Sequence, residues 1–253
     1  MGLTATPYRL ASNSMGSEMR FLTRTRDKMF DDLIYYVQRK QLYEQGFLAK
    51  MNYYPMPNGI EPSKMKYNSS GSDYSVDSYR THTAEIHLPT KIAELTHRMM
   101  NSTKETPRKN MLVFTRFVEE ANDVAAMVPG MVVITGKTKP GLRKELIDAF
   151  KAGQITKVAN VGTMTTGFDY PELEGIIVGR DMMSLNLWDQ ICGRGARPHP
   201  GKKETWITDL GKNIRRFGHM YDQEIGKDEK GRWMVHSKGR QLTNVLFGKG
   251  TPK

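Results

Sequence analysis

The stretch Gln190-Ile191-Cys192-Gly193-Arg194-Gly195-Ala196-Arg197 carries the strongest signal for the fold of this chain. It has the pattern Q-x-x-G-R-x-x-R. Two arginines three residues apart share one face of a helical turn, and the glycines let the backbone come close to whatever those arginines touch. An arginine fork keeps its charge and matches phosphate oxygens in pairs. The pattern therefore predicts a helix end that faces a phosphate group.

Three further stretches precede this octamer in the chain. They are Gly2-Leu3-Thr4-Ala5-Thr6-Pro7-Tyr8-Arg9, Met111-Leu112-Val113-Phe114-Thr115-Arg116 and Val161-Gly162-Thr163-Met164-Thr165-Thr166-Gly167-Phe168-Asp169-Tyr170-Pro171. In this order, and followed by the octamer, they resemble motifs III, IV, V and VI of superfamily-2 helicases. The closest resemblance is to the RadD-like group of DNA helicases, and it covers roughly residues 1–50 and 85–222.

The resemblance implies a role in catalysis for the octamer and its neighbours. Arg197 would act as an arginine finger on the γ-phosphate of ATP, with Arg194 as its partner and Gln190 in the same network. Gly167 and Asp169 would belong to the nucleotide site. Asp169 could accept a hydrogen bond from ribose hydroxyls or orient an arginine, and a helix N-cap is the alternative. For the two arginines, the alternative is a pair of structural ion pairs.

The resemblance also implies a nucleic-acid surface and a coupling segment. The residues expected to hold the nucleic-acid backbone are Thr115, Arg116, Thr135, Gly136, Lys137, Thr163 and Thr165. Several of them follow predicted strands, and ligands gather at the carboxyl ends of strands in a parallel sheet. Hydroxyls and backbone N–H groups bind phosphate without reading sequence. For Lys137, a solvated surface position is nearly as good an explanation. Thr4, Ala5 and Thr6 would couple the two lobes of the motor, as motif III does.

The sequence lacks a credible phosphate loop of the form G-x-x-x-x-G-K-[ST]. Gly136-Lys137-Thr138 follows Gly130 after five residues instead of four, and Val132-Val133-Ile134 between them is typical of a buried strand. Asp228-Glu229 lies in a charged tail and not at a strand end. We therefore expect ATP and Mg²⁺ to be held by a separate P-loop lobe, and this chain to be inactive alone. A split gene explains a boundary inside motif III better than an expression fragment does.

Composition favours a polyanionic partner. The 253 residues include 38 Lys+Arg and 27 Asp+Glu, which gives a formal charge of +11. Single-stranded or branched DNA is the expected partner, and RNA is an alternative. The positive charge is also compatible with an ordinary basic surface that has no nucleic-acid partner. One cysteine excludes an internal disulfide, and the six histidines show no metal-binding spacing. Without an apolar run near ~18 residues or a signal peptide, we expect no membrane contact and a cytoplasmic location.

Strands that alternate with helices from residue 88 onward predict an α/β fold with a parallel, doubly wound sheet. The resemblance implies that this sheet has the RecA-like, P-loop NTPase-type fold of a second helicase lobe, here without its own P-loop. The expected strands are Met111–Phe114, Met131–Ile134, Val158–Val161, Gly175–Val178 and Thr205–Thr208. The expected domains are residues 1–50 (motif III and the inter-lobe connection), 51–84 (a polar loop or insertion), 85–222 (the RecA-like domain) and 223–253 (a basic tail or hairpin).

Smaller features lead to further expectations. Residues 11–30 are polar and predicted to be irregular, and a helix is predicted over Val37–Gln45 with Gly46 as its C-terminal stop. The tyrosines of the polar loop (Tyr67, Tyr74 and Tyr79) are expected to be packing anchors, with base stacking as the alternative. Gly2–Thr6 resembles the end of a strand from the first lobe, so we expect it to be without a sheet here and Leu3 to be exposed.

Two functions fit these observations. The first is the second motor lobe of an ATP-dependent helicase or translocase that works with a P-loop lobe. The alternative is a non-catalytic nucleic-acid-binding or regulatory module derived from a helicase half. ATP turnover in the presence of a P-loop lobe separates the two.

Overall fold

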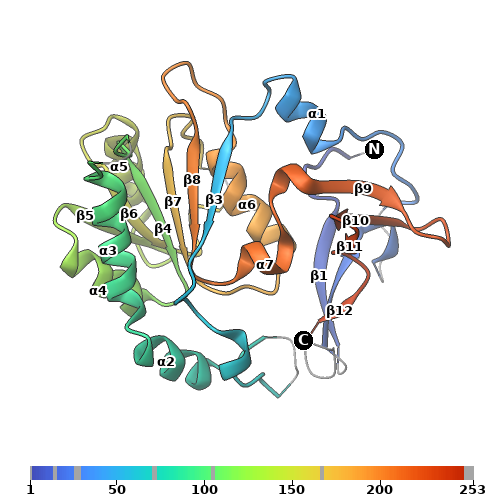
Figure 1. Cartoon of the computed structure of the whole chain (residues 1–253), viewed down its shortest axis with the longest axis horizontal. Helices are drawn as coiled ribbons and strands as arrows, with labels where there is room; N and C mark the ends of the chain where they lie inside the picture. Colours follow the sequence, from blue (N-terminus) through green and yellow to red (C-terminus); the bar gives the residue numbers. More distant parts are fainter. Residues whose placement is uncertain are drawn as a thin grey trace.

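A six-stranded parallel sheet forms the centre of the molecule (Figure 1). The computed structural model describes residues 2–13, 16–25, 30–69, 73–103, 106–165 and 168–247. The strands, in spatial order, are β3 (Met51–Pro55), β8 (Thr205–Asp209), β7 (Gly175–Gly179), β4 (Met111–Thr115), β6 (Lys157–Val161) and β5 (Met131–Thr135). Each neighbouring pair is parallel. The predicted α/β fold is confirmed, and the five expected strands lie within one residue of their predicted bounds.

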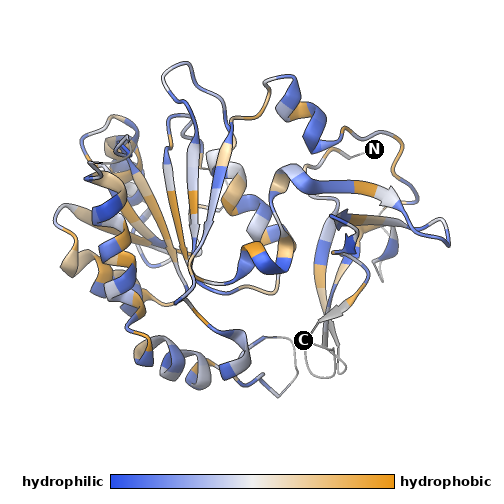
Figure 2. Ribbon diagram, viewed as in Figure 1, coloured by the Kyte–Doolittle hydropathy of each residue, from blue (hydrophilic) through white to orange (hydrophobic). Residues whose placement is uncertain are grey.

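Helices cover both faces of this sheet. They are α3 (Leu88–Met100) and α4 (Val118–Met127) on one face, and α5 (Pro140–Lys151) and α6 (Leu185–Gly195) on the other. On β4, Leu112 and Phe114 belong to the core under α5 and α6, whereas Met111 and Val113 belong to the core under α3 and α4. A strand buried on both faces must be apolar throughout, and apolar residues follow the central strands in Figure 2.

Residues 51–84 are not a polar loop throughout, so that expectation is wrong for two segments. β3 is the outermost strand and pairs only with β8. Its residues, Met-Asn-Tyr-Tyr-Pro, are partly buried or exposed, which explains why no apolar run marks the strand. A proline at the end of an edge strand removes no needed hydrogen-bond donor.

The second missed segment is α2 (Val76–Glu85), which follows the short 3-10 helix η2 (Pro62–Lys64). The Ser75 side chain caps α2 by accepting a hydrogen bond from the Ser78 N–H. Tyr74, just before α2, and Tyr79, within it, are buried, and Tyr67 stacks on Tyr74 with 5.0 Å between ring centroids. The loop tyrosines therefore pack within the chain, as expected.

Two small antiparallel sheets lie beside α6, on the right in Figure 1. One contains β1 (Tyr8–Asn13), β2 (Gly16–Phe21) and β12 (Leu246–Phe247), and the other β11 (Arg240–Gln241), β10 (Trp233–Ser237) and β9 (Gln223–Lys227). The hairpin expected within 223–253 is confirmed. The irregular segment expected over 11–30 is wrong, because Met19 and Phe21 of β2 are buried in the core next to α6.

The connection between the small sheets and β3 contains α1 (Arg39–Glu44), which is shorter than the predicted helix over Val37–Gln45. Gly46 ends it with φ +77°, a left-handed conformation that suits glycine. The remaining elements are η1 (Leu22–Arg24), α7 (Asn213–Phe217) and η3 (Met220–Asp222). Gly2–Pro7 forms no strand, and Leu3 is 98% exposed, as expected for the motif III segment.

The two glycines of α6 differ in the space around them, and this gives a stability prediction. A Cβ on Gly195 would lie 2.6 Å from Thr205 Cγ2 on β8, whereas a Cβ on Gly193 would meet nothing within 4 Å. We expect Gly195→Ala to lower the free energy of unfolding by about 1–3 kcal/mol through overpacking. Gly193→Ala should be neutral or stabilising by up to about 1 kcal/mol. Urea unfolding of both variants checks this, and equal effects would show that α6 does not press on β8 at Gly195.

Candidate functional site

Helix α6 turns one face to the core and the opposite face to a cavity. The Ser184 side chain starts the helix by accepting from the Leu187 N–H. Trp188 and Ile191 are fully buried in the core under α6, and the Trp188 indole N–H donates to the Gly218 carbonyl at 3.1 Å. The positions left for the other face are those of the Q-x-x-G-R-x-x-R pattern, whose residues line the cavity.

Arg194 is tied to the loop that follows β6. Its Nε donates to the Gln190 carbonyl at 3.2 Å, and a second guanidinium nitrogen donates to the Phe168 carbonyl. Burial and the nearby Arg197 charge lower the pKa of Arg194, although arginine stays charged in proteins. The predicted motif VI arginine thus fixes the motif V loop to α6.

Arg197 is held more loosely. Its Nε lies 3.0 Å from Asp169 Oδ1, and the two side chains are 46% and 54% exposed. An ion pair with this exposure contributes only about 0–1 kcal/mol. Asp169 is thus paired with Arg197 by an exposed ion pair, and its expected roles stay predictions. Gly167, also expected in the nucleotide site, lies outside the described residues.

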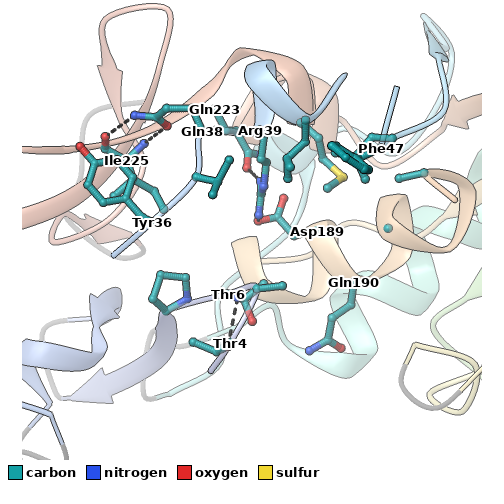
Figure 3. Close-up of a pocket in the computed structure, with 18 of the residues that line it drawn as sticks. Thr4, Thr6, Tyr36, Gln38, Arg39, Phe47, Asp189, Gln190, Gln223 and Ile225 are labelled. Atoms are coloured by element: carbon teal, nitrogen blue, oxygen red, sulfur yellow. Dashed lines mark hydrogen bonds and ion pairs between the residues drawn. The ribbon is translucent and has the colours of Figure 1, made fainter. Parts of the chain in front are cut away.

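The cavity beside α6 has a volume of about 720 Å³. It is lined by Thr4–Tyr8, by parts of the 33–48 connection, by Gln190, Gly193, Arg194 and Arg197, and by residues of β9 and β10. Figure 3 shows Thr4 and Thr6 on one side of this space and Gln190 nearby, with the Thr6 N–H donating to Thr4 Oγ1 at 3.1 Å. The structure thus brings the predicted coupling residues Thr4, Ala5 and Thr6 to the same cavity as the motif VI arginines.

A buried network forms one wall of the cavity, and the sequence analysis missed it. Asp189 Oδ2 accepts from the Tyr8 hydroxyl and, at 2.9 Å, from the Arg39 guanidinium. Arg39 also donates to the Tyr8 hydroxyl at 3.1 Å and to the Gln223 side-chain oxygen. Figure 3 shows Arg39 next to Asp189. Burial raises the pKa of Tyr8, which keeps its hydroxyl a donor. The four residues are far apart in the chain, so no local pattern reveals them; the only clue is an acidic residue inside the motif VI helix.

The residues expected to bind nucleic acid lie at one edge of the sheet. Thr115, Thr163 and Thr135 end or follow β4, β6 and β5, which are neighbours in that order. Two hydroxyls are already engaged locally: Thr115 donates to the Phe117 carbonyl at 3.1 Å, and Thr163 to the Ile134 carbonyl at 3.5 Å.

The other members of this set differ in how open they are. Gly136 and Lys137 are exposed, and Thr165 is partly exposed. The Lys137 N–H donates to Thr135 Oγ1 at 3.1 Å, which closes a tight turn after β5 and confirms that Gly136-Lys137-Thr138 is a strand end. Arg116 follows β4 at this edge, but its guanidinium is already paired with Asp73 at 3.0 Å. The roles of these residues stay predictions.

Proteins named as helicases match parts of the chain. The ATP-dependent helicase IRC3 of Saccharomyces cerevisiae is 36% identical over 77 residues, which are 30% of this chain and 11% of that protein. The mitochondrial ATP-dependent helicase irc3 of Schizosaccharomyces pombe is 30% identical over 122 residues, 47% of this chain and 20% of that protein. The protein of Haloarcula marismortui named as the DNA 3'-5' helicase Rad25 is 23% identical over 201 residues, 78% of this chain and 29% of that protein.

Solved structures agree on the fold. A fragment of an HsdR subunit of a type I restriction enzyme from Vibrio vulnificus has a TM-score of 0.59 at 19% identity, covering 77% of this chain and 39% of that one. The ATP-dependent type ISP restriction-modification enzyme LlaBIII bound to DNA has a TM-score of 0.52 at 17% identity, covering 82% of this chain and 15% of that one.

The sequence similarity supports a helicase C-terminal half, and we therefore call this chain the helicase half. No family model matches it. The helicase half spans less than a third of the length of each of the three curated relatives above. In the ranges that the structure describes, no helix is long and apolar enough to cross a membrane.

The buried and exposed ion pairs of this site give a second stability prediction. Asp189→Asn leaves the Arg39 charge buried without its partner, so we expect it to lower the free energy of unfolding by about 3–5 kcal/mol. Asp169→Asn removes only the exposed partner of Arg197 and should change it by about 1 kcal/mol or less. Chemical denaturation of the two variants measures both values. Similar small effects would mean that the Arg39–Asp189 pair does not hold α6 in place.

Proposed function

We propose that this helicase half is the second motor lobe of an ATP-dependent nucleic-acid helicase or translocase and acts with a P-loop lobe. In this proposal, the P-loop lobe holds ATP and Mg²⁺, and the helicase half supplies Arg197 as the arginine finger. The observation that carries the proposal is the position of Arg197: it lines the same cavity as the motif III segment, and its only described ion pair is exposed.

The geometry supports a division of labour between the two arginines. Arg194 is half-buried and bound to two backbone carbonyls, so it suits positioning. Arg197 can leave Asp169 at little energetic cost and pair with the γ-phosphate, whose charge is spread over its oxygens in the transition state. Gln190, bound to the Asn186 side chain at 3.1 Å, would support the same helix face. Asp169 would then be released to ribose hydroxyls or to solvent.

Exposed apolar side chains near the cavity support the presence of a partner lobe. Leu3, Ile34, Tyr35 and Phe47 are 98%, 78%, 78% and 65% exposed. Tyr35 and Phe47 line the cavity itself, and Leu3 adjoins Thr4. Large apolar side chains gathered around one cavity are typical of an interaction surface. Because this surface surrounds Arg197, a P-loop lobe that covered it would bring its nucleotide to the arginine.

The enzymatic part of the proposal is tested with a P-loop lobe supplied in trans. The helicase half alone should show only background ATP turnover, and the mixture with single-stranded DNA should hydrolyse ATP. Arg197→Ala should then lower the rate by about 10³-fold or more, the size expected for an arginine finger, while assembly and DNA affinity persist. Arg197→Lys should fail nearly as badly, because a point charge does not replace the planar fork.

Arg98→Ala is the matched control, since Arg98 is an exposed arginine on α3; its turnover should be unchanged. If Arg197→Ala keeps more than about a tenth of the rate, the finger must be another residue, because a true finger is worth far more. Robust Mg²⁺-dependent hydrolysis by the helicase half alone would contradict the split of roles. An assembly that binds DNA without any turnover would favour the non-catalytic module.

The nucleic-acid part of the proposal concerns the strand-end edge that carries Gly136, Lys137, Thr163 and Thr165. We expect sequence-tolerant binding of single-stranded DNA that weakens steeply with salt, since phosphate contacts release counterions. Lys137→Gln should reduce the slope of log affinity against log salt by about 0.7. Lys144→Gln is the matched control, because Lys144 is an 80% exposed lysine on α5. Fluorescence anisotropy measures both. Equal slopes for the two variants, or a strong preference for one base sequence, would count against backbone binding at this edge.

A further inference from the structure

The sheet contains a topological switch point between β4 and β7. The chain leaves β4 toward β5 on one side of the sheet, and it leaves β7 toward β8 on the other. Connections that diverge in this way open a crevice at the carboxyl ends of the two strands, where α/β proteins bind ligands. Thr115 and Gly179 are paired in register at these ends. The next residue of each strand, Arg116 or Arg180, therefore begins one side of the crevice.

Arg116 is already bound to a carboxylate in this crevice. Its two terminal nitrogens donate to the two oxygens of Asp73 at 3.2 and 3.0 Å, the fork geometry with which arginine also binds phosphate. Its guanidinium lies 4.3 Å from the Tyr79 ring centroid, which holds the plane in position. The Asp73 side chain is 46% exposed, so the carboxylate sits at the solvent edge of the crevice.

Arg180 has no such partner. Its Nε is buried without a hydrogen bond, and no side-chain hydrogen bond or ion pair joins it to the described part of the chain. Its backbone is fixed, because the carbonyl accepts from the Asn213 side chain at 2.8 Å. The nearest sequence neighbour with a negative charge, Asp181, is taken by Arg216 at 2.9 Å.

Of the three arginines near these strand ends, Arg180 is the one without an ion pair in the described part of the chain. Arg116 pairs with Asp73 and Arg216 with Asp181, and the buried Glu120 carboxylate accepts a hydrogen bond from the Arg116 backbone N–H. Burial and, to a smaller extent, the Arg116 charge lower the pKa of Arg180, whereas Tyr79, Asp73 and Asp181 raise it. An anion with two oxygens could bind the guanidinium groups of Arg116 and Arg180 at the same time. The Asp73 carboxylate binds only Arg116.

We propose that Arg116 and Arg180 form a phosphate site for the nucleic-acid backbone, and that the Asp73 carboxylate holds this site in the free chain. A backbone phosphate would displace Asp73 to solvent and pair with both guanidinium groups. The identification of the phosphate with nucleic acid rests on the proposed function. The site extends the binding surface beyond the β5 and β6 strand ends to the β4–β7 crevice, and it gives Arg116 a role only after Asp73 has moved.

The test compares three variants by anisotropy with a labelled oligo(dT) and by NMR with inorganic phosphate. Arg180→Gln should bind oligo(dT) about tenfold more weakly, which corresponds to about 1.4 kcal/mol, the low end for a hydrogen bond to a charged group. Asp73→Asn should bind about two- to fivefold more tightly, as expected when a half-exposed competing ion pair is lost. Arg98→Gln, an exposed arginine on α3 with the same charge change, should match the wild type. Phosphate should shift the Arg116 and Arg180 Nε–H signals in the wild type.

Each outcome decides between this inference and the proposed function. If oligo(dT) binds but Arg180→Gln and Arg98→Gln behave alike, the crevice site is wrong and the proposed nucleic-acid surface stands. If phosphate shifts the two Nε–H signals while oligo(dT) does not bind, the anion site stands and its nucleic-acid ligand is wrong. If neither ligand perturbs Arg180, the inference is overturned. Asp73→Asn provides an answer even if Arg180→Gln fails to fold, because tighter binding cannot come from a loss of structure.

Discussion

The buried ion pair between Arg39 and Asp189 is the interaction on which the arrangement of this site depends. Asp189 belongs to α6, Arg39 begins α1, Tyr8 begins β1 and Gln223 begins β9, so one hydrogen-bonded cluster joins four elements. Buried charges are retained at this depth only when they are paired, because an unpaired one is strongly destabilising. The pair therefore fixes the small sheets and the motif III segment against the helix that carries Arg194 and leads into Arg197.

The same helix connects the two proposed binding regions. Arg194 is bonded to the carbonyl of Phe168, and Arg197 is paired with the next residue, Asp169. The chain reaches these residues from Thr163 and Thr165 at the proposed nucleic-acid edge. If Arg197 exchanges Asp169 for a phosphate, the loop between β6 and β7 loses its ion pair to Arg197. The start of the same loop, at Thr163 and Thr165, is where the nucleic-acid backbone is proposed to bind. Under the proposed function, this loop would be a short physical connection between nucleotide and nucleic acid within one lobe.

The sequence predicts the parts of this structure that have a local signal. The central strands are apolar runs because they are buried on both faces. The expectation that Arg194 and Arg197 share a helix face is wrong, because α6 ends at Gly195 and Arg197 follows the C-cap residue Ala196. β3 was not predicted because an edge strand needs no apolar run. The β1–β2 hairpin was not predicted because its buried apolar side chains (Tyr8, Met19 and Phe21) are few and are separated by polar residues. The Tyr8–Arg39–Asp189 cluster and the pairing of Arg116 with Asp73 depend on tertiary contacts between distant residues, which periodicity and motifs do not encode.

The central claim is that the surface around Arg197 and the motif III segment receives a P-loop lobe. Hydrogen exchange at the amides of Leu3–Thr6 tests it most directly, with the β1 amides as an internal reference, since β1 is paired with β2 in the free chain. The account predicts fast exchange at Leu3–Thr6 in the helicase half alone, where these residues form no strand and are mostly exposed, and slow exchange once a P-loop lobe binds. Protection of these amides in the free chain, or fast exchange that persists in a formed complex, would contradict it.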